Sequence, residues 1–228
     1  MQTRPDLFAT AREAGETDAP ASSLRLGGLF DYFARLANGK PLRAALILET
    51  LLEAFGTIWQ NRPTLDGVPL GDCWPHPAFQ KTAERSGIPA DGYVALHKLS
   101  QWLSYSLIEP LQAAGIEVSG LNELTGLPEY RNGGLLIDTG VIVPRDVAAL
   151  SKPHEVSEPF VIGWRALTVA LLDQLAPLVG ERLGMTNDSF LLARVLEGGT
   201  WAAGRRLARE KRGDGSPPFQ IQSDGTVL

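Results

Sequence analysis

The stretch Val94–Gly140, VALHKLSQWLSYSLIEPLQAAGIEVSGLNELTGLPEYRNGGLLIDTG, joins a helical pattern to a polar loop that is punctuated by glycines. At 100° per residue, the leucines of its first half fall on one stripe and predict a helix face that packs against a core. The residues of this stripe are Leu96, Leu99, Leu103, Leu107 and Pro110. We predict that the rest of the chain is organised around this helix and loop.

The opposite side of the same helix carries His97, Gln101, Tyr105 and Ile108. The first three are separated by one helical turn each, so three hydrogen-bonding side chains can converge on a ligand. The alternative is that they are simply exposed, but a face without charge is more typical of a pocket wall or a second packing surface. His97, Gln101 and Tyr105 are therefore candidate binding residues.

The loop places four hydrogen-bonding residues in succession between flanking glycines, namely Glu129, Tyr130, Arg131 and Asn132. Glycine lets the backbone approach a ligand closely, which favours a functional loop. A structural turn with an internal Glu–Arg pair is the alternative. Residues 135–138 and 141–143 then predict the two short strands of a small β-hairpin, and Asp138 at the end of the first strand is a further candidate carboxylate.

The N-terminal part predicts a short helix and a linker over residues 1–24, and residues 25–228 predict a single helical domain. Apolar residues at helical spacing run over 25–37, where Asn38-Gly39 supplies a stop, and again over 41–59. The fold class that follows is mainly α, a multi-helix orthogonal bundle with one small β-hairpin.

The helix predicted over residues 41–59 is apolar almost all the way round, which is typical of a central helix. Glu49 and Glu53 lie one turn apart on it. They form either a narrow solvated stripe or a carboxylate pair that lines a pocket.

A second core helix is predicted from Pro159 onward, with Pro177 kinking or ending it. Its predicted core stripe comprises Trp164, Leu167, Leu171, Leu175 and Leu178. Arg165 lies inside this apolar segment and is a candidate anion ligand if it faces inward. The polar connector before the helix contains His154, which we expect to be exposed.

Gly198, Gly199 and Thr200 precede the basic segment WAAGRRLAREKR. A Gly-Gly-Thr turn at a helix start exposes backbone N–H groups and a hydroxyl at the positive end of the helix dipole, which suits phosphate. Thr is also an ordinary N-cap, and basic residues near a helix C-terminus complement the dipole. With Arg205, this turn is a candidate phosphate site.

The formal charge of −5 and the pI near 5.3 argue against general binding to nucleic acid or to an anionic membrane, because both need a basic field. One cysteine excludes an internal disulfide framework and a multi-cysteine zinc site. The first residues contain no stretch of signal-peptide length. We predict a cytoplasmic protein that binds neither nucleic acid nor membrane.

The common catalytic motifs are absent: there is no Walker loop, no dinucleotide-binding G-x-G-x-x-G, no H-E-x-x-H and no G-x-S-x-G. A proline-rich segment over 61–78 brings Asp72, Trp74 and His76 within five residues. It is either a loop that carries a site or a strap pinned against the core.

Several long runs carry a family resemblance, namely PLRAALILETLLEAFGTIW, LHKLSQWLSYSLIEPL, LTGLPEYRNGGL, WRALTVALLD, LEGGTWAAGRRLA and SDGTV. From about residue 28 to the end they resemble the uracil-catabolism protein family of bacteria and fungi, a domain of unknown function. The resemblance is to the C-terminal part of longer proteins, so we expect a truncated or split member. One departure is Gly163, where members of the family tend to carry an acidic residue.

This resemblance implies uracil degradation through a ribosylurea intermediate. Combined with the residues, it leads us to expect a hydrolase that cleaves a C–N bond in a phosphorylated, ribosylurea-type intermediate, with Glu129 or Asp138 as catalyst. The expected phosphate ligands are Arg131, Arg165, Gly198, Gly199, Thr200 and Arg205. The expected ribose and urea ligands are His97, Gln101, Tyr105, Tyr130 and Asn132.

Two other classes stay open: a non-catalytic helical partner subunit, and a truncated remnant of the longer enzyme. The expected ligand is a small pyrimidine-derived molecule, and the expected protein partner is a separate N-terminal half or a second copy. The sequence assigns no cofactor and no metal.

Overall fold

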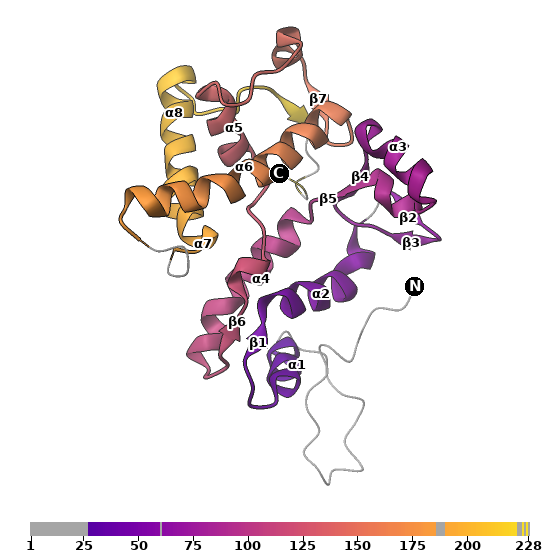
Figure 1. Cartoon of the computed structure of the whole chain (residues 1–228), viewed down its shortest axis with the longest axis vertical. Helices are drawn as coiled ribbons and strands as arrows, with labels where there is room; N and C mark the ends of the chain where they lie inside the picture. The colour runs from indigo at the N-terminus through magenta and orange to yellow at the C-terminus, as the bar shows by residue number, and fades with distance from the viewer. Residues whose placement is uncertain (1–26, 60, 186–189, 223–224, 226, 228) are drawn as a thin grey trace. The chain divides into compact units, whose positions relative to one another are not determined.

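The computed structural model describes residues 27–59, 61–185, 190–222, 225 and 227. The helix and linker predicted for residues 1–24 lie outside these residues. The described chain is mainly helical, with short strands joined only in pairs (Figure 1), which confirms the predicted fold class. We predicted one domain over 25–228; the chain divides into two compact units, Met1–Asn61 with Trp102–Leu124, and Arg62–Gln101 with Thr125–Leu228.

The first unit is built from two helices, two very short strands and most of a third helix. Its elements are α1 (Gly28–Ala37), β1 (Leu42–Arg43), α2 (Ala44–Phe55), the 3-10 turn Gly56–Ile58, residues 102–113 of α4 (Lys98–Ala113), β6 (Val118–Ser119) and the 3-10 turn Leu121–Glu123. Its core is formed by residues that are almost fully buried, including Phe33, Ile47, Leu51, Ile108 and Leu111.

The predicted stop of the first helix is confirmed. Asn38 and Gly39 both adopt left-handed backbone conformations, and the Asn38 N–H donates to the Ala34 carbonyl. The next helix starts later than predicted, at Ala44 rather than at Pro41. The reason is tertiary: Leu42 N–H donates to the Glu117 carbonyl, so the chain stays extended and pairs with β6.

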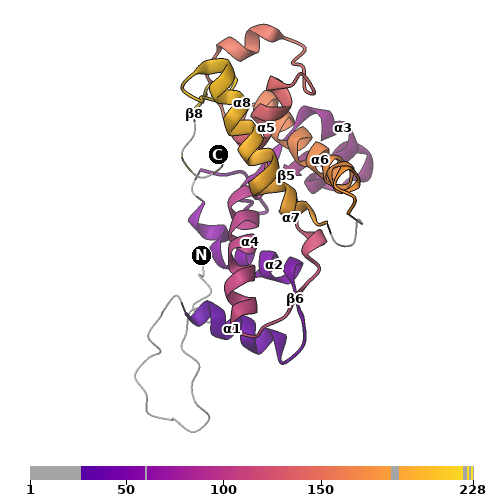
Figure 2. The same cartoon turned by 90° about the vertical axis from the view of Figure 1, so that its left-hand side faces the viewer.

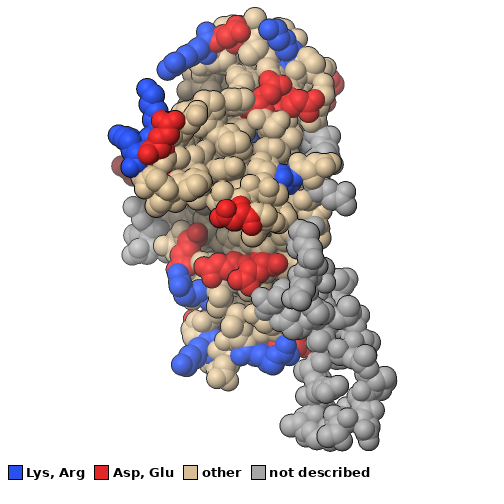
Figure 3. Space-filling model, turned by 90° about the vertical axis from the view of Figure 1, so that its right-hand side faces the viewer, with Lys and Arg blue, Asp and Glu red and all other residues tan. Residues whose placement is uncertain are grey.

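Glu49 and Glu53 are both exposed, in agreement with the solvated-stripe alternative. Figure 3 shows one face of the molecule, on which both acidic and basic side chains lie and much of the surface carries no charge. The net negative charge therefore does not form a single acidic field on this face.

The second unit contains three pairs of strands and most of the helices. Its elements are β2 (Thr64–Leu65), β3 (Val68–Pro69), β4 (Cys73–Pro75), α3 (Pro77–Ser86), the 3-10 turn Pro89–Gly92, β5 (Tyr93–Ala95), the start of α4, α5 (Tyr130–Asp138), the 3-10 turn Val147–Ser151, β7 (His154–Glu155), α6 (Pro159–Arg182), α7 (Leu192–Val195), the π-helix Leu196–Trp201, α8 (Ala202–Arg212) and β8 (Ile221–Gln222). Strands β2–β3 and β4–β5 are antiparallel, and β7–β8 is parallel.

The helix predicted from Val94 begins only at Lys98. Residues 93–95 instead pair with β4, and His97 has φ +46°, a left-handed conformation that interrupts the chain before α4. The predicted stripe is also rotated: Ser104 and Ile108 are buried, whereas Pro110 is exposed. Cross-strand pairing decides the start of this helix, and neighbouring elements decide which face is buried.

The predicted strands at 135–138 and 141–143 are not formed, because residues 130–138 form the helix α5. The Glu129 side chain caps this helix by accepting from the N–H groups of Arg131 and Asn132. A Cβ at Gly133 would collide with the indole of Trp164, so Gly133 allows close packing of α5 against α6. The hairpin of this unit lies at β2–β3, where Asp66 and Gly67 turn with positive φ.

Helix α6 continues through Pro177 to Arg182, so the proline does not end the helix. Its buried face differs from the prediction, since Leu167 and Leu178 are exposed while Arg165 and Leu172 are buried. By length and composition α6 could cross a membrane, but the core helix of a folded unit meets the same criteria.

Near the C-terminus, β8 pairs in parallel with β7. His154 on β7 is buried, contrary to our expectation of exposure. Its ring packs against Phe160 and Phe219, and both ring nitrogens have acceptors, the Glu158 carboxylate and the Ala149 carbonyl, at 2.7 Å.

Candidate functional site

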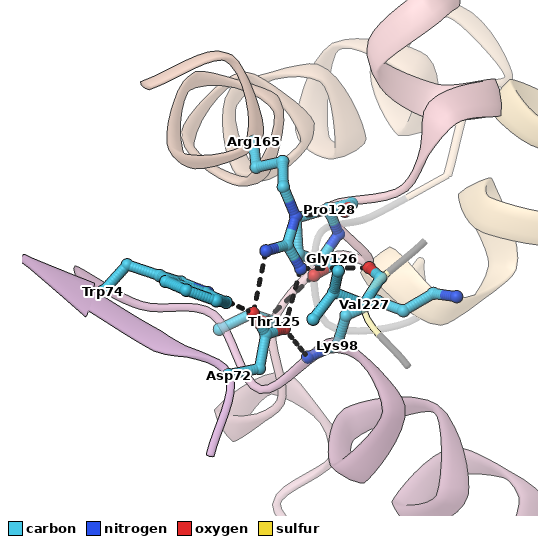
Figure 4. Close-up of polar contacts among 8 residues, drawn as sticks. All are labelled: Asp72, Trp74, Lys98, Thr125, Gly126, Pro128, Arg165 and Val227. Atoms are coloured by element: carbon cyan, nitrogen blue, oxygen red, sulfur yellow. Dashed lines mark hydrogen bonds and ion pairs between the residues drawn. The ribbon is translucent and has the colours of Figure 1, made fainter. Parts of the chain in front are cut away.

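A buried ion pair joins two segments of the second unit (Figure 4). Arg165 on α6 donates from Nη1 and Nη2 to the two oxygens of Asp72, at 2.8 and 2.7 Å. The exposed fractions of the two side chains are 0% and 3%. Burial alone would raise the pKa of Asp72, but the hydrogen bonds and the charge of Arg165 lower it more. Asp72 is therefore ionised at neutral pH.

This pair anchors segments that are far apart in the sequence (Figure 4). Asp72 also accepts from the indole N–H of Trp74 at 2.8 Å and from the backbone N–H of Lys98 at 3.0 Å. The Arg165 guanidinium donates to the carbonyls of Pro128 at 3.1 Å and Val227 at 3.2 Å. The anion that Arg165 binds is thus a carboxylate of its own chain, which leaves it a framework role instead of the predicted phosphate contact.

Glu129 occupies the N-cap position of α5 and is 1% exposed. Its carboxylate accepts from the N–H of Asn132 at 2.7 Å and of Arg131 at 3.0 Å. Burial raises the pKa of Glu129, although these hydrogen bonds and the charge of Arg131 oppose the rise. A buried carboxyl group whose pKa is raised by burial has the properties of an acid–base catalyst.

Polar atoms without hydrogen-bond partners gather around the first turn of α5. The buried atoms Arg131 Nε and Asn132 Oδ1 have no partner within the described residues. Arg131 stacks on the rings of Tyr130 and Trp201 and approaches the Glu129 carboxylate at 3.5 Å. Because buried polar groups are nearly always hydrogen-bonded, these atoms indicate that water or a ligand group belongs here.

A cleft of about 310 Å³ lies between α5, α8 and the loop that follows α8. Figures 1 and 2 both show the two helices side by side. Four arginines line the cleft, namely Arg131, Arg205, Arg209 and Arg212, together with Tyr130, Asp138 and Asp214. The arginines of α8 follow the spacing i, i+4, i+7, which places them on one face of the helix. Four guanidinium groups face two carboxylates, so the cleft is electropositive within an acidic protein.

Close contact between α5 and α8 depends on Gly204, where a Cβ would collide with the Arg131 carbonyl. The far end of the cleft is held by Arg212, which donates to the Asp138 carboxylate at 2.7 and 2.5 Å and to the Ser216 carbonyl at 2.6 Å. Asp138, one of the two predicted catalysts, is therefore engaged in an ion pair at the rim of the cleft.

The predicted phosphate turn has a different structure. Residues 198–200 lie inside the π-helix Leu196–Trp201, which continues directly into α8. Thr200 donates its hydroxyl to the carbonyls of Val195 and Leu196 instead of capping a helix start. Since no helix begins here, the backbone N–H groups are not presented as an anion cradle. Arg205, in contrast, does line the cleft.

The three residues predicted on one helix face are distributed differently. His97 precedes α4, and burial lowers its pKa. Gln101 is buried, and its side-chain oxygen accepts from the Thr125 N–H at 3.3 Å. Tyr105 packs against the core of the first unit. The common ligand-binding face predicted for His97, Gln101 and Tyr105 is therefore not a single helical surface.

Lys98 is a residue that the sequence reasoning passed over. It is half-buried, whereas the other four lysines of the chain are exposed. Burial lowers the pKa of Lys98; Arg165 and Arg131 lower it further, while the negative charges of Glu129 and Asp72 raise it. The sequence signal that could have identified Lys98 was its position next to His97, on a helix with an uncharged polar face. Within the described residues no group of metal-ligating side chains comes together.

Comparison with known proteins identifies the family. The family described as "Protein of unknown function (DUF1688)" matches residues 4–228. The chain belongs to this family. Uracil catabolism protein 4 of Lachancea kluyveri is 39% identical over 203 residues, which cover 80% of this chain and 45% of that protein. Protein urg3 of Schizosaccharomyces pombe is 40% identical over 185 residues, which cover 79% of this chain and 43% of that protein.

The chain thus spans less than half the length of these two relatives. No solved structure matches it. The resemblance seen in the sequence is confirmed at the level of the family.

Proposed function

We propose that the protein takes part in uracil catabolism and hydrolyses the C–N bond between ribose and urea in a phosphorylated, ribosylurea-type intermediate. The name of the Lachancea kluyveri relative supports the pathway. The observation that carries the reaction type is the buried Glu129 carboxyl, which is linked through Arg131 to the arginine-lined cleft.

The cleft supplies the argument for a phosphorylated substrate. Arg205 and Arg209 have no acidic partner within the described residues, and they face the same cleft as Arg131. Guanidinium groups bind phosphate oxygens through paired, charge-assisted hydrogen bonds. A phosphate in the cleft would offset the surplus of positive charge that the two aspartates leave.

Glu129 supplies the argument for acid–base chemistry. Cleavage of an N-ribosyl bond needs a proton on the departing urea nitrogen and removal of a proton from the attacking water. A carboxyl group with a raised pKa can donate the first proton and accept the second. The contacts favour Glu129 over Asp138 as catalyst, because Asp138 is already paired with Arg212.

The test is urea release from synthetic ribosylurea 5′-phosphate, followed by mass spectrometry with an isotope-labelled urea group. We expect release by the purified chain and a loss of about 10²–10⁴-fold in kcat for Glu129→Gln, the usual size of an acid–base contribution. Asp173→Asn is the matched control, since Asp173 is an exposed carboxylate of the same unit.

The phosphate assignment has its own matched pair on α8. Arg209→Gln removes a cleft arginine and is expected to raise KM, whereas Arg206→Gln alters an arginine that pairs with Glu210 and does not line the cleft. A second arm adds the remaining part of the longer Lachancea kluyveri relative. Absence of urea release in both arms would refute the hydrolase proposal, and release only in the second arm would favour a partner-dependent enzyme.

A further inference from the structure

Lys98 has an environment that distinguishes its amine from an ordinary surface amine. The side chain is half-buried, and no hydrogen bond or ion pair of the amine is found within the described residues, although the backbone N–H of Lys98 is bonded to Asp72. In Figure 4 the side chain extends away from the Asp72–Arg165 pair. The groups whose charges act on it are Glu129, Arg165, Arg131 and Asp72.

The buried ion pair holds Lys98 and Glu129 in a fixed relation. Asp72 accepts from the backbone N–H of Lys98, and Arg165, bound to Asp72, donates to the carbonyl of Pro128. Pro128 directly precedes Glu129. The Asp72–Arg165 pair therefore positions both residues. Buried ion pairs often add little net stability, so this positioning gives the pair a specific role.

The backbone just before Lys98 is strained in a way that is consistent with a site. His97 has φ +46°, although it is not a glycine. Such conformations cost on the order of 1–3 kcal/mol and persist where the surrounding structure imposes them. Here the His97 N–H and the Leu96 N–H both donate to the Asp72 carbonyl, so the same residue imposes the turn.

We propose that the Lys98 amine is a nucleophile that forms an imine with the C1 carbon of a pentose phosphate, with Glu129 as its proton donor. With an open-chain aldehyde, the Nζ–C1 bond forms, the C1–O bond breaks, and the oxygen leaves as water. Desolvation and neighbouring cations are the conditions that make a lysine amine nucleophilic. This inference rests on the proposed function for its choice of substrate.

In the proposed reaction the same step would displace urea. The Nζ–C1 bond forms while the C1–N bond to urea breaks, and the ring C1–O bond opens to complete the imine. The two protons lost by Nζ are balanced by one taken up on urea, delivered by Glu129, and one on the ring oxygen. Water then hydrolyses the imine, releases the pentose phosphate and restores the amine.

The experiment uses ribose 5-phosphate as probe and borohydride to reduce the imine to a stable secondary amine. Peptide mapping by mass spectrometry locates the adduct. We expect the adduct on Lys98 at neutral pH, in excess over the exposed Lys81, and its loss in Lys98→Arg, which keeps a positive charge but cannot form an imine. Ribose without phosphate is expected to label Lys98 less.

Replacing the Lys98 side chain is not expected to disturb the fold. Asp72 binds the backbone N–H of Lys98, and this hydrogen bond stays in place in the variants. Lys98→Met, checked by circular dichroism, is the second variant. Equal labelling of Lys98 and Lys81 would overturn the inference. Urea release that survives in Lys98→Arg would refute the role of Lys98 as nucleophile and leave the proposed hydrolase function standing. Imine trapping on Lys98 without any urea release would support the reactive lysine and refute the proposed hydrolase function.

Discussion

Replacing Asp72 by Asn tests whether the buried ion pair supports the second unit. The side chain keeps its size, but Arg165 then remains fully buried without a counter-charge. The carboxylate of Asp72 accepts four hydrogen bonds, from two guanidinium nitrogens, the Trp74 indole and the Lys98 backbone. An amide can accept only through its oxygen and turns an NH₂ group toward these donors.

The expected destabilisation is about 3–5 kcal/mol, the usual cost of removing one partner of a buried ion pair. This is a large share of the roughly 5–15 kcal/mol that stabilises a typical domain. With a urea m-value of about 2 kcal/mol/M, the unfolding midpoint would fall by about 1.5–2.5 M. Adding Arg165→Met to Asp72→Asn removes the unpaired charge, so the double variant should be more stable than the single one.

The pH dependence has a defined sign. Arg165 and its hydrogen bonds lower the pKa of Asp72 more than burial raises it. A carboxyl group with a lowered folded-state pKa stabilises the fold above its unfolded pKa, near 3.9, and loses this contribution as pH falls through the folded value. The difference between wild type and Asp72→Asn should therefore be constant from about pH 5 to 8 and shrink below about pH 4.

The assay is urea unfolding followed by tryptophan fluorescence and far-UV circular dichroism at each pH. Asp173→Asn serves as control. Asp173 lies on α6, the helix that also carries Arg165, but its carboxyl group is exposed. Exposed substitutions usually change stability by less than about 0.5 kcal/mol. If Asp72→Asn unfolded within that margin of wild type at pH 7, the ion pair could not be the anchor described above.

Three further outcomes follow from the contacts. Burial lowers the pKa of His154, but hydrogen bonds to Glu158 and to a backbone carbonyl raise it more. The stabilisation from protonated His154 is therefore fully present below about pH 6.5 and is lost as pH rises through the raised pKa. Thermal unfolding scans should show a fall in melting temperature over this range that His154→Gln lacks. Gly204→Ala should destabilise by about 1–3 kcal/mol because its Cβ meets the α5 backbone, whereas Gly198→Ala, with no atom within 4 Å, should be neutral or stabilising in urea unfolding. Burial raises the pKa of the Cys73 thiol to about 11, so a maleimide should label it at pH 7.5 only after denaturation, and fast labelling of the folded protein would contradict this burial.

Local signals in the sequence were sufficient for part of the fold. The Asn38-Gly39 stop depends on residues close in sequence, and it is present. The candidate site was also partly predictable. Tyr130, Arg131 and Arg205 line one cleft because two helices, each with its polar residues at helical spacing, pack side by side.

Other features could not be read from local patterns. Residues 135–138 were predicted as a strand, yet a capping carboxylate at Glu129 and the glycine contact with Trp164 make them helical. The phosphate turn expected at 198–200 is absorbed into a continuous helix. In both cases a neighbouring element supplies the stabilisation that the local preference lacks.

By itself, the sequence determined a mainly helical chain, the family to which it belongs and a short set of polar residues around Glu129. Only the tertiary structure decided that Arg165 binds Asp72, 93 residues away, and that this pair holds Lys98 and the segment before Glu129. The physical reason is that a buried charge must find its counter-charge wherever the packed chain brings one, and sequence spacing does not encode that meeting.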